Sequence, residues 1–327
     1  MLLKISRLTE QVKNGEPPSV AQGMEILTAR GAALTACLAG AHHLREDFFG
    51  NRIELCSIIN AKSGRCPENC AFCAQSAHYT TDAPVYPLKR LEEIVAGAQQ
   101  AEAEGSHCYG IVTSGARIDH GGEFETILAA IRTIREKCAL APSASLGILD
   151  RKMAQALADA GCVTYHHNLE TARSFFPQIC STHDYEEDVE TIRIAKAAGM
   201  RVCSGGILGL GESLEQRIEL AETLRQLEVN SVPLNFLNPI QGTPLSGKQT
   251  LTPMDCLRSI AMFRYWLPRT PIRVCGGREL NLREFQSWIF MAGATGTMIG
   301  NYLTTSGRDR DTDMQMIRDA EVEFDAC

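Results

Sequence analysis

Three cysteines lie close together in the sequence at a spacing suited to an iron–sulfur cluster. They are Cys66, Cys70 and Cys73, in the pattern C-x3-C-x2-C, with Phe72 directly before the third. Three thiolates can ligate three irons of a cubane [4Fe–4S] cluster and leave the fourth iron without a protein ligand. A structural zinc site usually needs a second cysteine pair, which does not follow nearby, and an odd number of thiols disfavours disulfides. The spacing therefore predicts a [4Fe–4S] cluster whose open iron binds another molecule.

A glycine-rich segment, Gly205 to Glu212, follows a run that we predict as a strand and reads G-x-I-x-G-x-x-E. Its glycines let the backbone approach a flat ligand, and Ile207 can pack on an adenine face. Taken alone, the glycine-rich segment is explained better as an ordinary tight turn. It is not a dinucleotide-binding motif, because that motif belongs in the first βα turn of a doubly wound sheet. Together with the cysteine loop, it resembles the adenine-contacting segment of radical S-adenosylmethionine (SAM) enzymes. The resemblance implies that SAM chelates the open iron.

The elements that must position these residues alternate along the chain. Strands are predicted at residues 53–59, 107–113, 143–148, 163–168, 202–207, 231–237, 272–275 and 295–299. Helices are predicted at residues 91–104, 124–137, 152–160, 186–198, 214–226, 253–266 and 282–290. Asp184 and Ser213 are expected N-caps, and Gly105, Gly161 and Gly199 are expected C′ residues. Eight βα repeats in about 250 residues favour an α/β fold of the (β/α)8 TIM-barrel type over a doubly wound sheet.

We predict two parts in the chain, a helical N-terminal extension over residues 1–48 and the barrel over residues 49–327. Within the extension, two short helices over residues 18–44 are expected to break at Gly31 and Gly40. The chemistry of such barrels lies at the carboxyl ends of the strands. The cysteine loop follows the first predicted strand and therefore belongs to that face.

Composition favours an enzyme of the cytoplasm. The chain has 327 residues, is 44% hydrophobic and carries a net charge of −7. The negative charge and the lack of a basic run argue against a nucleic-acid partner. No apolar stretch is long enough to cross a membrane, and the start of the chain does not read as a signal peptide. Thirteen cysteines indicate metal and redox chemistry in a reducing compartment.

Six stretches of the sequence resemble the biotin synthase family of radical SAM enzymes. They are SGRCPENC at 63–70, YHHNLET at 165–171, VCSGGI at 202–207, SVPLN at 231–235, GTPL at 242–245 and MAGA at 291–294. The resemblance implies dethiobiotin as substrate, a 5′-deoxyadenosyl radical that removes hydrogen from two saturated carbons, and sulfur from a second iron–sulfur cluster. It further implies that an electron donor such as flavodoxin or ferredoxin reduces the enzyme and that iron–sulfur assembly proteins supply its clusters. A homodimer is compatible with the resemblance.

The resemblance also assigns ligand-binding residues. Asn168 and Asn235, at the ends of two predicted strands, carry amides that suit the ureido ring of dethiobiotin, although strand-end capping of the backbone explains them equally well. The family more often has Asp at Glu170 and Asn at His166. The expected SAM-binding residues are Phe72, Asn168, Glu170, Gly205, Ile207 and Gly209.

The second cluster is where the sequence departs from the family. The best-known members hold a [2Fe–2S] cluster with three cysteines and one arginine. Cys203 and Arg273 match two of those positions, but Gly110 and Ser143 occupy the other two. Neither glycine nor a neutral serine is a normal iron ligand. The usual form of this cluster is therefore not expected.

Other cysteines fall on the same inward strand faces, because residues two apart in a strand share a face. Cys108 shares its face with Gly110, and Cys275 shares its face with Arg273. We predict an all-cysteine second cluster of the four-iron type, with Arg273 beside it and four thiolate ligands: Cys56, Cys108, Cys203 and Cys275. The alternative is ordinary core packing of small thiols. Cys180 stays undecided.

Two other functions remain open from the sequence. One is a related radical SAM enzyme, such as a hydrogenase-cofactor maturase or a carbon-skeleton mutase, which would share the first cluster and the glycine-rich segment. The other is a non-enzymatic iron–sulfur carrier, which would need neither that segment nor a barrel. The histidines show no H-x3-H pair on a helix, so no separate catalytic metal is proposed.

Overall fold

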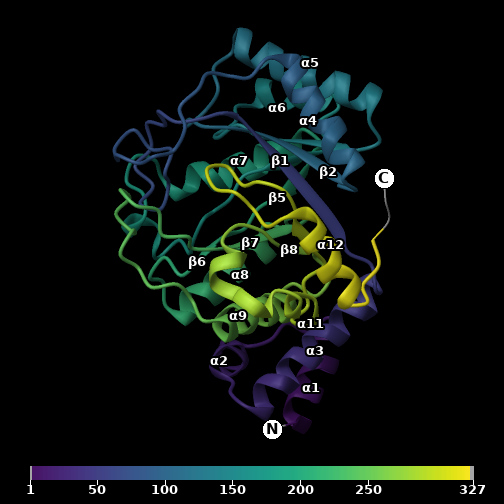
Figure 1. Cartoon of the computed structure of the whole chain (residues 1–327). Helices are drawn as coiled ribbons and strands as arrows, with labels where there is room; N and C mark the ends of the chain where they lie inside the picture. Colours follow the sequence, from purple (N-terminus) through teal and green to yellow (C-terminus); the bar gives the residue numbers. More distant parts are fainter. Residues whose placement is uncertain (1, 325–327) are drawn as a thin grey trace.

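Nine parallel strands form the sheet at the centre of the molecule, counted over residues 2–324, which the computed structural model describes (Figure 1). Along the sheet their order is β5-β4-β3-β2-β1-β9-β8-β7-β6. Their bounds are β1 (Glu54–Lys62), β2 (Cys108–Thr113), β3 (Ala141–Ser145), β4 (Thr164–His166), β5 (Arg201–Cys203), β6 (Gly206–Leu208), β7 (Val232–Phe236), β8 (Ile272–Val274) and β9 (Gly296–Met298). Except for β5 and β6, successive strands are connected through a helix, which returns the chain to the same end of the sheet and makes the strands parallel.

The two ends of this sheet are halves of one predicted strand, residues 202–207. β5 pairs with β4, whereas β6 pairs with β7. Between the halves, the Ser204 amide donates to the Ser231 carbonyl at 3.0 Å, and the Ile207 amide donates to the Glu170 carbonyl at 2.8 Å. These bonds tie the segment to both neighbours and close the sheet. The predicted (β/α)8 barrel is confirmed, with its fifth strand split in two.

Helices surround the barrel, and most begin and end where the sequence predicts. Their bounds are α4 (Leu91–Ala103), α5 (Gly122–Lys137), α6 (Arg151–Asp159), α7 (Tyr185–Ala197), α8 (Leu214–Gln226), α9 (Pro253–Trp266), α10 (Arg278–Leu282), α11 (Trp288–Met291) and α12 (Arg310–Asp319), with 3-10 turns η1 (Phe176–Gln178) and η2 (Arg283–Phe285). Asp184 and Ser213 form capping boxes, as expected. Gly105, Gly161 and Gly199 all have positive φ, the conformation that ends a helix.

Two predictions about helices are wrong. The expected helix over 282–290 is broken, because Arg283 has a φ of 51° and separates α10 from α11. Gly40 does not break the extension, since α3 runs through it. An added side-chain carbon at Gly40 would lie 2.0 Å from the Tyr265 hydroxyl, so this glycine provides space for packing between helices. The sequence reasoning also did not predict α12.

The N-terminal helices α1 (Leu2–Lys13), α2 (Val20–Thr28) and α3 (Ala32–Phe49) lie against α9, below the barrel in Figure 1. α9 is buried along nearly its whole length. Apolar residues of the extension, beginning with Ile5, belong to the same buried core as those of the barrel. The extension therefore covers a face of the barrel's own helical layer.

Candidate active site

One cavity of about 470 Å³ contains most of the predicted site residues. It is lined by the three cysteines of the loop (Cys66, Cys70, Cys73), by the four strand cysteines (Cys56, Cys108, Cys203, Cys275) and by Phe72, Asn168, Glu170, Ile207, Asn235 and Arg273. Gly205 and Gly209 do not line it. The fold therefore brings both predicted cysteine groups to a single space.

The loop cysteines are half-buried thiols on a turn held by backbone bonds. The Cys73 amide donates to the Cys70 carbonyl at 2.9 Å, and the Cys66 amide donates to the Gln75 carbonyl at 2.9 Å. Burial raises the pKa of the Cys66 thiol and raises the pKa of Cys73 to about 11. Thiols of this kind become thiolates when a metal binds them. Three of them facing one cavity fit the three protein ligands of a [4Fe–4S] cluster.

Glu170 is the most perturbed carboxyl group of the cavity. Its backbone has a φ of 60°, a conformation that non-glycine residues rarely adopt. Burial, helped by the negative charge of Asp188, raises the pKa of Glu170 to about 8. Asn168 donates a weak hydrogen bond to its carboxylate at 3.4 Å. A half-buried carboxyl group with a raised pKa, at a cavity wall, suits a ligand that offers hydroxyl donors.

The glycines of the G-x-I-x-G-x-x-E segment have a structural role that the sequence analysis missed. An added carbon at Gly205 would lie 2.0 Å from the Pro233 carbonyl oxygen, so the space is filled by strand β7 rather than by a ligand. Gly209 has a φ of 93° and turns the chain after β6. The Glu212 carboxylate accepts the Gly209 amide at 2.9 Å and pairs with Arg217 at 2.8 Å. Of the predicted residues in this segment, only Ile207 lines the cavity.

Asn168 and Asn235 line the cavity and also bind the backbone. The Asn168 amide oxygen accepts from the Gly205 amide at 3.2 Å, and the Asn235 oxygen accepts from the Gly276 amide at 2.9 Å. Asn235 also donates to the Gly206 carbonyl at 3.3 Å. A primary amide has two N–H donors and two acceptor positions, so backbone capping leaves capacity for a ligand. The structure therefore shows backbone capping by both residues, and their contact with a ligand stays a prediction.

Two of the four strand cysteines, Cys56 and Cys108, lie on the adjacent strands β1 and β2, whereas Cys203 ends β5 and Cys275 directly follows β8. Cys56 and Cys108 stand opposite each other in the β1–β2 register. Their mutual hydrogen bond lowers the pKa of Cys56 and raises that of Cys108. Burial raises the pKa of Cys275, and the nearby thiols of Cys56 and Cys203 raise it further. The four thiols therefore form one group in the cavity wall.

Gly110 and Ser143, which the sequence analysis assigned to two of the family's ligand positions, are partners in the β2–β3 register. Ser143 is almost fully buried, and its hydroxyl donates to the Tyr109 carbonyl at 3.2 Å. An added carbon at Gly110 would lie 3.1 Å from Ile58 and 3.4 Å from the Ser143 oxygen. Neither position offers an iron ligand.

Arg273 lies among the strand cysteines and forms an ion pair with Glu54. Burial opposes its charge, but the thiols of Cys56 and Cys108 outweigh burial and raise the pKa of Arg273 well above its usual value. Its Nε is buried and has no hydrogen-bond partner among the described residues. The buried Nε–H of Arg273 lacks an acceptor and lies among four thiols, so an anionic group bound at this place would satisfy it. Sequence reasoning missed Glu54.

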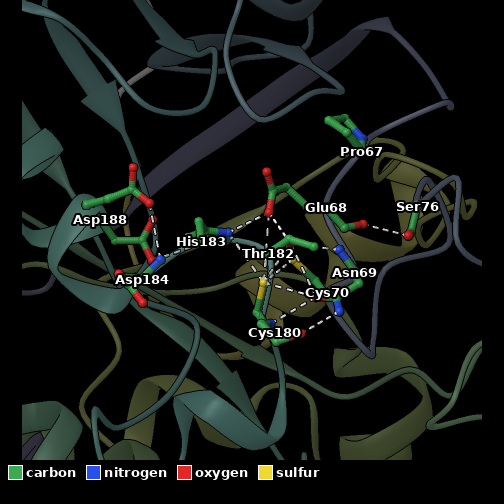
Figure 2. Close-up of polar contacts among 12 residues, drawn as sticks. Pro67, Glu68, Asn69, Cys70, Ser76, Cys180, Thr182, His183, Asp184 and Asp188 are labelled. Atoms are coloured by element: carbon green, nitrogen blue, oxygen red, sulfur yellow. Dashed lines mark hydrogen bonds and ion pairs between the residues drawn. The ribbon is translucent and has the colours of Figure 1, made fainter.

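A third group, which sequence reasoning did not assemble, joins the cysteine loop to the segment before α7 (Figure 2). Cys180 Sγ lies 3.8 Å from Cys70 Sγ and 3.3 Å from His183 Nδ1. The contact with Cys70 and that with His183 lower the pKa of Cys180 to about 3, and Asp188 and Cys180 raise the pKa of His183 to about 11. Glu68 pairs with His183 at 2.7 Å. The only signal in the sequence was the C-x2-H spacing at 180–183.

Comparison with known proteins gives two matching domain families. Residues 61–224 match the Radical SAM superfamily, and residues 233–323 match the Biotin and Thiamin Synthesis associated domain. The chain is 58% identical over 323 residues to biotin synthase of Syntrophotalea carbinolica, covering 99% of both chains. It is also 58% identical to biotin synthase of Geobacter metallireducens, covering 99% of this chain and 98% of the relative. The chain belongs to the biotin synthase family.

Solved structures agree with the fold. Methylornithine synthase superposes with a TM-score of 0.83 at 20% identity, covering 96% of this chain and 95% of that one. A maturase of the [FeFe]-hydrogenase superposes with a TM-score of 0.84 at 16% identity, covering all of this chain and 76% of that one. These likenesses show a shared barrel only.

Family membership confirms the prediction of a radical SAM enzyme that inserts sulfur into dethiobiotin, with a [4Fe–4S] cluster and SAM as cofactors. The family's second cluster is a [2Fe–2S] cluster, so the predicted four-iron, all-cysteine form in this chain remains a proposal. The maturase, mutase and carrier alternatives are not supported. Among the described residues, no helix is long and apolar enough to span a bilayer.

Proposed function

We propose that this chain converts dethiobiotin to biotin in the cavity that its two cysteine groups share. The proposal rests on the residues that line the cavity, because a single cavity of about 470 Å³ is lined by the loop cysteines, the strand cysteines and the two asparagines, Asn168 and Asn235. When bound, the first cluster with SAM supplies the radical that removes hydrogen from saturated carbons, and the second cluster supplies sulfur. The protein's part is to place substrate between these groups and to exclude water.

We assign the residues as follows. Cys66, Cys70 and Cys73 hold the first cluster. Asn168 and Asn235 bind the ureido ring with the amide positions that backbone capping leaves free. The SAM subsite is formed by Phe72, Asn168, Glu170 and Ile207 at the cavity, with Gly205 and Gly209 shaping the backbone behind them. The half-buried carboxyl group of Glu170 accepts from the ribose hydroxyls.

For the second cluster, we propose four thiolate ligands and a four-iron form. The ligands are Cys56, Cys108, Cys203 and Cys275. Arg273 stays charged because of the thiols around it, and a charged guanidinium has no lone pair to give to iron. It therefore balances the charge of the cluster from beside it.

Several properties of the whole enzyme belong to the proposal. We propose a cytoplasmic location, since thirteen cysteines need a reducing compartment. Proposed protein partners are an electron donor of the flavodoxin or ferredoxin type and iron–sulfur assembly proteins, and a homodimer is the proposed assembly.

Anaerobic SAM cleavage tests the first cluster and the substrate together. Replacing Cys66 or Cys73 with Ala should abolish cleavage of SAM to methionine and 5′-deoxyadenosine, because a cluster with two protein ligands is not retained. In the wild type, dethiobiotin should stimulate cleavage and yield biotin. Cys138→Ala, at the half-exposed end of α5, is the matched control and should behave as wild type. Wild-type cleavage by Cys66→Ala, or stimulation by another small molecule but not by dethiobiotin, would refute the proposal.

A further inference from the structure

Three donor side chains that the proposed reaction does not use meet beside the cysteine loop (Figure 2). They belong to Glu68, Cys180 and His183, and their ligand atoms all lie within 4.8 Å of one another. Cys180 Sγ is 3.3 Å from His183 Nδ1, which lies 2.7 Å from a Glu68 carboxylate oxygen. Thiolate, imidazole and carboxylate are donors that bind zinc and ferrous ions.

Cys70 provides a fourth donor. Its Sγ lies 3.8 Å from Cys180 Sγ. Two thiolates on one tetrahedral ion, with metal–sulfur bonds of about 2.3 Å, stand about 3.8 Å apart. Thiolates on different irons of a cubane lie farther apart, because each points away from its own corner. The sulfur–sulfur distance therefore matches a single shared ion.

The surroundings of His183 resemble the outer layer of a metal site. Its Nε2 lies 3.4 Å from one oxygen of the buried Asp188, whose other oxygen is 2.8 Å from His167 Nε2. A carboxylate behind a ligating histidine orients the ring toward the metal. Over residues 2–324, the ion pairs of Glu68 and Asp188 come from histidines and from no lysine or arginine. A divalent cation would balance these negative charges.

The site is held ready by contacts between its two loops. Asn69 donates to the Ser181 hydroxyl at 2.8 Å and accepts from the Ser181 amide at 2.9 Å. These bonds join the neighbour of Cys70 to the neighbour of Cys180. All four donors also line the cavity, which gives an ion a path of entry.

We propose that the cluster-free chain binds one divalent ion, Zn²⁺ or Fe²⁺, in a tetrahedral site made by Cys70, Cys180, His183 and Glu68. Binding the ion releases the Cys70 thiol proton and the proton that His183 Nδ1 holds toward Glu68, and both leave to solvent. The ion and the [4Fe–4S] cluster exclude each other, a consequence that rests on the proposed function because Cys70 serves both. Zn²⁺ bound here blocks cluster assembly.

Cobalt binding tests the site, because Co²⁺ reports thiolate ligation by absorbance. The full-length chain is freed of clusters, reduced, and titrated anaerobically with Co²⁺. We expect the wild type to bind one more tetrahedral ion than Cys180→Ala, with a difference spectrum that shows thiolate-to-cobalt charge transfer. Asp188→Asn should keep the stoichiometry and weaken this binding by about 10- to 100-fold. Cys138→Ala controls for the loss of a thiol elsewhere.

Two further measurements complete the test. With the [4Fe–4S] cluster loaded, the extra ion should be absent, and Zn²⁺ added before iron and sulfide should delay cluster formation in wild type but not in Cys180→Ala. Circular dichroism of Cys180→Ala checks its fold. Equal cobalt uptake by wild type and a folded Cys180→Ala, or an extra ion that persists beside the cluster, would overturn the proposal. Because uptake is measured without cluster or SAM, its failure would leave the proposed function standing.

Discussion

Arg273 keeps its positive charge because it lies among thiols and beside Glu54. A neutral arginine would be needed to ligate iron, and this environment favours the charged form. In the proposed second cluster, Arg273 therefore lies beside the iron, and the strand cysteines, among them Cys108 two residues before Gly110, are the proposed ligands. Its unpaired Nε is left to donate toward the bound group.

Loss of single strand cysteines should remove the second cluster alone. We expect Cys203→Ala and Cys275→Ala to lower the iron content after anaerobic reconstitution from about eight to about four per chain. Biotin formation should be lost, while SAM cleavage stays largely intact. Arg273→Lys should retain all the iron, since its side chain is no ligand.

Cys256→Ala is the control for this experiment, because Cys256 is fully buried on α9 and takes no part in the cavity. An iron content near six in the wild type would indicate a two-iron second cluster and contradict the four-iron form. Loss of iron in Arg273→Lys would show that arginine is a ligand.

Glu170 should make the stability of the cluster-free chain depend on pH. Its pKa rises from 4.5 to about 8 on folding, so charging it costs free energy in the folded state. That cost is absent below about pH 4.5, grows as pH rises, and is complete above about pH 8. Glu170→Gln cannot charge, so its free energy of unfolding should exceed that of wild type at about pH 9 and differ little near pH 4.

Urea unfolding of the cluster-free chains at these two pH values measures this difference. Glu284→Gln, an exposed carboxyl group in η2, should show no such dependence. A Glu170→Gln variant that is equally stable to wild type at high pH would show that Glu170 is not held in a costly environment. Weaker SAM binding by the same variant is the expected functional cost of the gain in stability.

At the scale of elements, the kink between β5 and β6 closes the barrel and lies beside Glu170 and Ile207, which we propose for the SAM subsite. It depends on close approach of three backbones. An added carbon at Gly206 would lie 2.4 Å from the Glu170 carbonyl oxygen, which cannot move without disturbing the bond from the Ile207 amide. The glycines therefore serve the ligand indirectly, by letting the strands meet.

Gly206→Ala should destabilise the chain by about 1–3 kcal/mol, the usual cost of overpacking a filled site. It should also weaken SAM binding, because Glu170 and Ile207 move apart. Gly122→Ala, at the start of α5, has open space around its added carbon and should leave stability unchanged or slightly raised. Chemical denaturation measures the stability of both variants. A Gly206→Ala variant with the same denaturation midpoint as Gly122→Ala would contradict the prediction.

At the scale of the whole molecule, the N-terminal extension protects a helix that would otherwise face water. α9 is buried on both its barrel side and its extension side, and the Thr9 and Tyr265 hydroxyls bond across this contact at 2.9 Å. We propose that residues 1–48 form a helical extension whose role is this cover. Deleting them would expose the apolar face of α9.

We expect the truncated chain to be largely insoluble, or to unfold at a clearly lower temperature than the full chain. Soluble yield and thermal unfolding measure the effect. Lys4→Ala removes only the exposed Lys4–Glu25 ion pair of the extension and should change stability by less than about 1 kcal/mol. A truncated chain that is soluble and as stable as the full one would show that the barrel needs no cover.

The sequence by itself determined the features that depend on near neighbours. The cysteine loop, the helix caps at Asp184 and Ser213, and the alternation of strands and helices all arise within one or two turns of chain, where spacing and capping chemistry act directly. Strand parity also placed Cys108 and Cys275 on inward faces. The predicted break at Gly40 was wrong because packing between helices decided it, and the predicted helix over 282–290 was wrong because the chain turns at Arg283, whose φ is 51°.

Only the tertiary structure decided which distant groups meet. Cys70 and Cys180 are 110 residues apart, and Arg273 and Glu54 are 219 apart, yet each pair is in contact. Closing a barrel brings the loops after different strands to one mouth, and the order in which they meet depends on strand register, which local pattern does not encode. For that reason the sequence showed which residue types could ligate a metal at this site, but not which distant residues they would contact.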